Sequence, residues 1–318
     1  MPLTDRPGTD DIGLRMSIRM HDPAGGYRDI LGTLVSPTTI QKKDGSLVSF
    51  DPERIALWRK VTPRIDRAGK GSPLSLRIDE IERAAAATWP ATEEVLLGDW
   101  ILRASGKFTM RANSVLALGA PNIDIHSAIS QVIEFYRERD LTPTIHIALP
   151  TYVELDELLA REGWDEKLVV HVMVCDIHGS ELKARTEGTW EFSQSPSEEW
   201  IQLQSDEGAR AIMESYPAIY TGLRIGGELV AIGRAANFEK WTVLTRLFVI
   251  PNRRGKGLGG ELVIQLLNAA SQAGATKALL QVDSKNSPAI GLYKKLGFSL
   301  HHAYKYRLLR ARETRSEC

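Results

Sequence analysis

The chain has 318 residues, of which 43% are hydrophobic and 25% charged, a composition typical of a soluble globular protein. Because this length exceeds what one ordinary core accommodates, we expect two or three domains. Lysine plus arginine and aspartate plus glutamate each number 40, so no net charge favours nucleic acid or an anionic membrane as a partner.

The cysteine content and the termini indicate the compartment. Cys175 and Cys318 are too few for a disulfide framework and lack the spacing of a zinc site, so no metal is expected. The N-terminal stretch is acidic and has no apolar core like that of a signal peptide, and no later apolar run is long enough to span a bilayer. These features predict a cytoplasmic protein and leave a homodimer open.

The first segment, residues 1–72, reads as short strands joined by tight turns. Alternating or β-branched sequence predicts strands at 15–20, 30–35, 39–42 and 46–50, and the Asp, Pro and Gly residues of 22–26 and 43–45 suit the turns between them. A small SH3-like β-barrel is the economical arrangement, because closing the sheet hides its edges. The Gly, Ser and Lys residues of 67–75 then form a linker.

Two segments of mixed α+β pattern follow, residues 73–185 and 186–318. The first predicts helices at 78–88, 125–139 and 153–162 and strands at 100–104, 113–118, 144–148 and 168–174. The second predicts helices at 198–204, 207–216, 258–273 and 288–296 and strands at 219–225, 229–235, 242–250, 277–282 and 298–308. The similar order of elements suggests an ancient duplication.

A glycine-rich turn between a strand and a helix carries the first functional signal. The strand ends in Leu247, Phe248 and Val249, and the turn and the start of the helix comprise Arg253, Arg254, Gly255, Lys256, Gly257, Leu258, Gly259 and Gly260. Such a turn directs backbone N–H groups and the positive end of a helix dipole toward one point, where a pyrophosphate can bind. Taken alone, the pattern also fits a plain tight turn or a dinucleotide loop.

A second motif separates these alternatives. About thirty residues later, Asn286 can cap a short helix that carries Tyr293 and ends at Gly297. Arg254, Gly257 and Gly259, followed by Asn286, Ala289, Leu292, Tyr293, Gly297 and Phe298, resemble in order and separation the two coenzyme motifs of the GNAT superfamily of N-acetyltransferases. The resemblance is specific over residues 241–300 and elsewhere concerns only the order of elements.

The resemblance implies a fold of tandem GNAT-like domains, of which residues 186–318 form the intact one, and acetyl-CoA as co-substrate. It implies that Leu247, Phe248 and Val249 bind pantetheine where the strand splays from its parallel neighbour. The Val249 N–H would stabilise the thioester oxygen during attack, and Tyr293 would protonate the leaving thiolate of CoA. A packed tyrosine without a catalytic role is the alternative for Tyr293.

One position departs from the family pattern. Where GNAT proteins often carry a glutamate on the strand that ends at Val249, this chain has Arg246. The base is then a water relay or a group from elsewhere, with Glu239 and Asp283 as candidates by sequence proximity. Arg246 itself either binds a carboxylate of the acceptor or forms a surface ion pair.

The middle segment has no glycine-rich turn, which predicts that it binds no CoA. It does place polar residues within strand-like sequence, where they cost stability unless they have partners. Arg103, Arg111, Asn113 and Ser114 are therefore candidates for the acceptor pocket, with salt bridges inside a degenerate domain as the alternative.

The whole layout resembles bacterial multidomain acetyltransferases, including stand-alone N-acetylglutamate synthases. It suggests acetylation of a small amino acid such as glutamate, as in arginine biosynthesis. A mycothiol synthase-like enzyme, a protein or peptide amine acetyltransferase, and a non-catalytic acyl-CoA sensor are the alternatives.

Overall fold

A computed structural model describes residues 6–23, 25–61, 68–106, 108–177, 187–204 and 207–310. The chain divides into two compact units, Met1–Asp66 and Arg67–Cys318. Arg67, the first residue of the predicted linker, lies outside the described residues, and the last two residues of that linker already belong to a helix. Among the described residues, no helix has the length and apolar character needed to cross a membrane.

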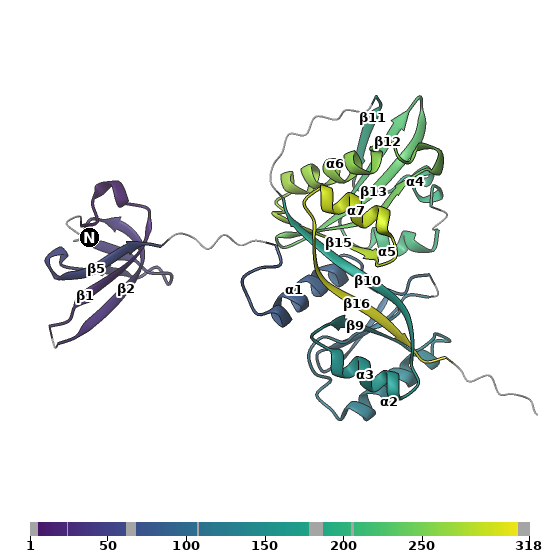
Figure 1. The fold of residues 1–318 in the computed structure, drawn as a ribbon, viewed down its shortest axis with the longest axis horizontal. Helices are drawn as coiled ribbons and strands as arrows, with labels where there is room; N and C mark the ends of the chain where they lie inside the picture. The colour runs from purple at the N-terminus through teal and green to yellow at the C-terminus, as the bar shows by residue number, and fades with distance from the viewer. Residues whose placement is uncertain are drawn as a thin grey trace, which may run out of the picture. The chain divides into compact units, whose positions relative to one another are not determined.

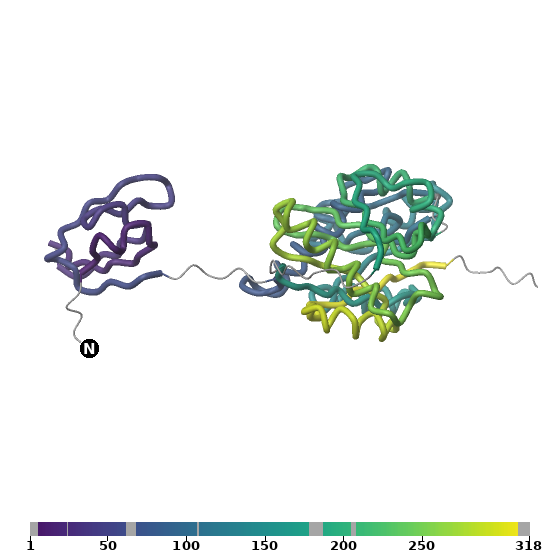
Figure 2. Tube along the Cα trace, turned by 90° about the horizontal axis from the view of Figure 1, so that it is seen from above, coloured from purple at the N-terminus to yellow at the C-terminus, as the bar shows by residue number. Residues whose placement is uncertain are grey.

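The N-terminal unit is a five-stranded antiparallel sheet of order β4-β3-β2-β1-β5, and Figure 2 shows its trace, in purple, folding back on itself. Its strands are β1 (Arg15–His21), β2 (Tyr27–Ser36), β3 (Thr39–Gln41), β4 (Leu47–Ser49) and β5 (Ile55–Lys60). One face buries Met16, Ile18, Met20, Ile30, Leu34, Ile40 and Phe50, as the alternation predicts. The described pairings leave β4 and β5 at the edges, so the closed SH3-like barrel stays a prediction.

The second unit contains mixed α and β elements, as predicted. Its helices are α1 (Leu74–Ala87), α2 (Ile125–Arg137), α3 (Val153–Arg161), α4 (Glu198–Gln202), α5 (Arg210–Glu214), α6 (Leu258–Gln272) and α7 (Ser287–Lys295). Its strands are β6 (Glu93–Leu97), β7 (Trp100–Ala104), β8 (Val115–Leu116), β9 (Thr144–Leu149), β10 (Asp165–Asp176), β11 (Thr189–Ser193), β12 (Ile219–Ile225), β13 (Glu228–Phe238), β14 (Trp241–Val249), β15 (Lys277–Asp283) and β16 (Ser299–Leu308). The sequence missed β5, β6 and β11, because their exposed positions break the apolar alternation.

The eleven strands of this unit form one sheet, in which the two segments exchange their last strands. β10, from residues 73–185, lies between β15 and β16, and β16 in turn pairs with β9. Figure 1 shows β10 and β16 running side by side through the middle of the unit. Residues 73–185 and 186–318, which the sequence analysis treats as separate domains, therefore share one sheet and cannot move apart without breaking the three ladders β10–β15, β10–β16 and β16–β9.

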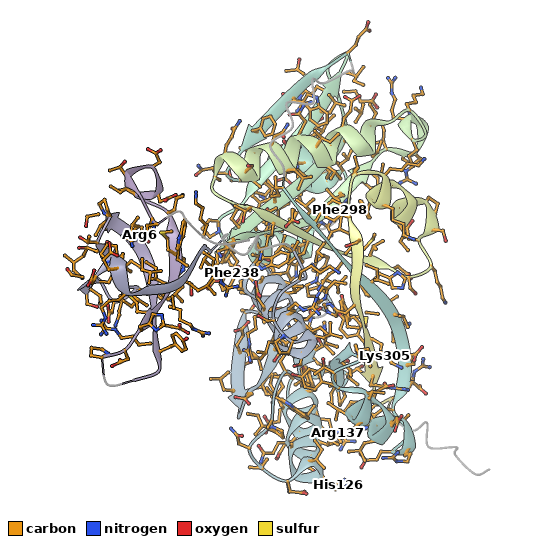
Figure 3. The ribbon with its side chains drawn as sticks, turned by 60° about the vertical axis from the view of Figure 1, so that its left-hand side comes forward. Arg6, His126, Arg137, Phe238, Phe298 and Lys305 are labelled. Carbon is orange, nitrogen blue, oxygen red and sulfur yellow. The ribbon has the colours of Figure 1, made fainter. Side chains whose placement is uncertain are left out.

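Ion pairs and a helix hold this junction together. Lys305 on β16, labelled in Figure 3, takes part in these ion pairs. It binds Asp156 on α3 at 2.7 Å and Glu166 on β10 at 3.0 Å. α1 buries Ile78 and Ile81 against residues of β10, β14 and β16. The junction is thus a packed core, with Lys305 paired to carboxylates of α3 and β10.

Candidate active site

A β-bulge opens the sheet between β14 and β15. The two strands run parallel and pair only from Trp241 opposite Lys277 to Leu244 opposite Leu280. Just beyond this point the pairing of β14 with β13 shifts register, and Arg246 adopts a left-handed conformation with φ 58°. A bulge increases the local twist and bends the strand. The end of β14 consequently diverges from β15, as the splayed arrangement expected from the sequence requires.

The backbone of Val249 faces this opening. Ile250 N donates to Val230 O at 3.0 Å, so the neighbouring Val249, opposite Ala231, occupies a non-hydrogen-bonded position of the ladder. Its N–H and C=O groups therefore point away from β13. The carbonyl accepts from Arg254 Nε at 2.9 Å, which leaves the N–H directed into the gap.

The glycine-rich turn leads into α6. Gly257 is the N-cap of this helix, with φ 85°, a conformation that favours glycine. No side chain of the described residues caps the helix, so the N–H groups ahead of Gly260 lack an intrahelical acceptor and remain available to an anion. Gly259 serves packing as well, because a Cβ there would lie 3.3 Å from Leu292 Cδ2 of α7.

A first cavity of about 950 Å³ lies between these elements. It is lined by the end of β14, the glycine-rich turn, the first turns of α6, and α7: Leu247, Phe248, Val249, Arg253, Arg254, Gly255, Gly257, Leu258, Gly259, Gly260, Leu262, Val263, Asn286, Ser287, Pro288, Ala289, Gly291, Leu292, Tyr293 and Lys295. Every coenzyme-binding residue predicted from the sequence lines it except Lys256. Its size and its cationic, N–H-rich end suit a long ligand with phosphates.

The far wall of the first cavity is α7. Asn286 caps this helix as predicted, with Oδ1 accepting from Ala289 N at 3.2 Å. Tyr293 projects from its second turn against Phe298, at a centroid distance of 6.0 Å. Figure 3 labels Phe298, which lies where the chain turns into β16. Burial raises the pKa of the Tyr293 phenol, so the group keeps its proton at neutral pH.

A second cavity, of about 620 Å³, adjoins the first and shares Leu247, Asn286 and Tyr293 with it. The remaining lining residues come from both halves of the unit: Trp89, Phe108, Thr109, Met110, Arg111, Leu168, Val170, Gln204, Leu244, Thr245, Arg246, Leu280, Gln281, Val282, Asp283, Tyr304 and Tyr306. The two cavities therefore meet beside Tyr293 and the splayed end of β14.

Two arginines give the second cavity its charge. Burial, and then the nearby charge of Arg111, lower the pKa of Arg246 to about 10, which still leaves it a cation at neutral pH. The Arg111 guanidinium lies 5.6 Å from the Trp89 ring centre, and its buried Nε has no hydrogen-bond partner among the described residues. A buried donor without an acceptor is costly. An anionic ligand would satisfy it.

The other predicted acceptor residues lie elsewhere. Arg103 donates to Ser114 O at 2.9 Å and to Ser114 Oγ at 3.1 Å, and Asn113 bonds the backbone of residues 105 and 109. None of the three lines the second cavity. Of the two candidate bases, Asp283 lines it, whereas Glu239 lies at the β13–β14 turn with φ 51° and lines neither cavity.

The corresponding helix start in the other half is closed to anions. α2 is capped by Asp124, whose Oδ2 accepts from Ser127 N at 3.0 Å. The carboxylate occupies the helix end where α6 offers bare N–H groups, and its charge would repel a phosphate. That residues 73–185 hold no CoA stays a prediction, which this cap favours.

Sequence reasoning missed Trp89, Phe108, Gln281, Tyr304 and Tyr306 as cavity residues. Four of these five are apolar or aromatic positions that read as core. Tyr304 and Tyr306 reach the cavity from β16, which the exchange places beside β10, and no local motif signals that exchange.

Known proteins share this architecture. A family model described as "Probable histone acetyltransferase Rv0428c C-terminal" matches residues 76–307. The uncharacterized N-acetyltransferase YobR of Bacillus subtilis is 30% identical over 247 residues, 73% of this chain and 99% of that protein. The probable histone acetyltransferase Rv0428c of Mycobacterium tuberculosis is 29% identical over 310 residues, 93% of this chain and 94% of its own length.

A solved structure supports the same fold. The GCN5-related N-acetyltransferase from Kribbella flavida superimposes with a TM-score of 0.57 at 14% identity, over 76% of this chain and 95% of that one. Proteins of this fold use acetyl-CoA as co-substrate. The chain therefore belongs to the GNAT superfamily of N-acetyltransferases, in the family of the C-terminal part of Rv0428c.

Proposed function

We propose that the first cavity binds acetyl-CoA and that the acetyl group passes to the amine of a small acid held in the second cavity. The observation that carries this proposal is the meeting of the two cavities at Leu247, Asn286 and Tyr293. A thioester at that junction would lie beside the Val249 N–H on one side and the arginine-lined space on the other.

The residues at the junction supply each step of the transfer. The acceptor amine attacks the thioester carbon, forming a C–N bond, while the Val249 N–H stabilises the charge on the carbonyl oxygen. The C–S bond then breaks, and Tyr293 donates its proton to the departing thiolate. The amine proton leaves to Asp283, the only carboxylate among the described residues lining the second cavity, or to water.

The positive charge of the arginines in the second cavity favours one class of acceptor. Arg111 and Arg246 favour a carboxylate, with which a guanidinium pairs in bidentate fashion. A histone, the kind of acceptor that the name of the probable histone acetyltransferase Rv0428c suggests for that protein, is basic and would bring further positive charge to these cations. We therefore favour a small amino acid, with glutamate as the leading example, over a protein acceptor.

Replacing either arginine should weaken acceptor binding selectively. We expect Arg111→Met and Arg246→Met each to raise the KM for an acidic amine by about 10- to 100-fold, the range for a lost charged hydrogen bond, with the KM for acetyl-CoA unchanged. Arg224→Met is the matched control, because Arg224 binds Glu191 and Glu199 away from both cavities. Steady-state kinetics with each substrate varied in turn provides the measurement.

Thiol release tests the function as a whole. Acetyl-CoA is incubated with the full-length protein and each of the twenty protein L-amino acids, L-methionine sulfone, spermidine or a histone tail peptide. We expect CoA release that depends on the added amine with one or more of the amino acids. Release only with spermidine or the peptide would contradict the proposed acceptor, and binding of acetyl-CoA without release would indicate a sensor.

A further inference from the structure

Glu82 is a buried carboxylate close to the second cavity but outside its lining. It projects from α1, is 1% exposed, and its oxygens lie 2.8 Å from His302 Nε2 and 3.2 Å from His146 Nε2. Burial opposes its charge, but the two imidazoles outweigh that effect and hold the pKa of Glu82 below its ordinary value. A buried charge is costly even when paired, and Ile78 and Ile81 already anchor α1.

Gln281 connects this carboxylate to the cavity wall. Its Nε2 lies 3.5 Å from Glu82 Oε2, and because a carboxylate only accepts, the amide nitrogen must face Glu82. The amide oxygen is thereby turned toward Tyr304, whose hydroxyl donates to it at 3.3 Å. Both distances are long, as is common before a ligand binds.

This orientation decides what Tyr304 offers to a ligand. Burial raises the pKa of Tyr304, as does a hydrogen bond with the neighbouring Tyr306, so Tyr304 remains a phenol with one proton, for which Gln281 Oε1 is an acceptor at 3.3 Å. Its ring is fixed by stacking on His146 at a centroid distance of 3.9 Å. Since Tyr304 lines the second cavity, its oxygen presents lone pairs there and can accept an N–H.

We propose that Glu82, Gln281 and Tyr304 form a hydrogen-bond relay that fixes the Tyr304 oxygen as the acceptor for an N–H of the substrate amine. The inference rests on the proposed function, because it takes the second cavity as the amine site. An amine held in this way has one N–H committed to Tyr304. Glu82 is then a positioning residue that acts through Gln281.

A double-mutant cycle tests the relay, using the amine of the panel above that turns over fastest. We expect Tyr304→Phe and Glu82→Gln each to lower kcat/KM for that amine about tenfold, the cost of one hydrogen bond to a polarised partner. The kcat/KM of the double variant should also fall about tenfold, because both substitutions break the same series of hydrogen bonds. The KM for acetyl-CoA should not change in any of the three.

Glu80→Gln is the matched control, since Glu80 lies on the same helix and accepts from Trp241 Nε1 at 2.7 Å without reaching either cavity. It should leave kcat/KM unchanged. Should Glu82→Gln fail to fold, Gln281→Leu replaces it in the cycle and leaves the carboxylate with both imidazoles. A roughly hundredfold loss in the double variant, or no loss in Tyr304→Phe, would overturn the relay. No turnover of any amine by the wild type would instead refute the proposed function, and the relay with it.

Discussion

Gly257→Asp should weaken acetyl-CoA binding by at least about 100-fold. Aspartate tolerates left-handed backbone better than most residues, and a Cβ at Gly257 meets no atom within 4 Å, so the turn itself can persist. The new carboxylate would stand at the uncapped start of α6, accept its N–H groups and repel the phosphates. Calorimetric titration with acetyl-CoA measures the change.

The other end of the same helix provides a control. Gly274 follows α6, has φ 95°, and also leaves a Cβ with nothing within 4 Å, but it lines neither cavity. Gly274→Asp imposes the same backbone demand and the same charge, so affinity should match that of the wild type. An equal loss of acetyl-CoA affinity in both variants would mean that the substitutions disturb the helix and not the phosphate contact.

Tyr293→Phe should lower kcat by about 100-fold or more, the usual contribution of a positioned general acid, while acetyl-CoA affinity stays the same. The ring still fills its place against Phe298, so only the proton is removed. The pKa of this phenol is raised by burial. Loss of its proton should therefore slow the wild type only above about pH 10, the ordinary phenol range.

Tyr216→Phe tests whether a lost phenol is harmful in general. The Tyr216 hydroxyl donates to Asn237 O at 2.8 Å away from the junction of the cavities. We expect near-normal kcat in this variant. If Tyr293→Phe had the same kcat as the wild type, Tyr293 would have no part in the mechanism, and water would protonate the thiolate.

The residues proposed to bind the coenzyme could be selected from the sequence because they are close together along the chain. The turn around Gly257 needs left-handed backbone and bare N–H groups, and the glycines of the sequence indicate both. The Asn286 cap is a hydrogen bond from a side chain to the backbone three residues ahead. Both features can be recognised in the sequence without knowledge of the fold. The boundaries of β7 and β12 were likewise predicted to the residue, since each is a run bounded by turn residues.

The lining of the second cavity, the proposed acceptor site, was predictable only in part, because it depends on contacts between distant segments. Arg246 was identified as a departure from the family pattern and Arg111 as a polar residue in strand-like sequence, but the reasoning that selected Arg111 also selected Arg103, whose partner Ser114 lies eleven residues along the chain. Period and propensity cannot distinguish a buried arginine that bonds its own hairpin from one that faces a cavity. That difference arises from the exchange of β10 and β16, which the order of elements does not reveal.

Hydrogen–deuterium exchange of the full-length protein, with and without saturating acetyl-CoA, tests the central claim most directly. We predict slower exchange of backbone amides at 247–249, at 254–260 and along α7, with no change around Asp124 at the start of α2. Protection confined to other segments, or none at all, would contradict the assignment of the first cavity to the coenzyme.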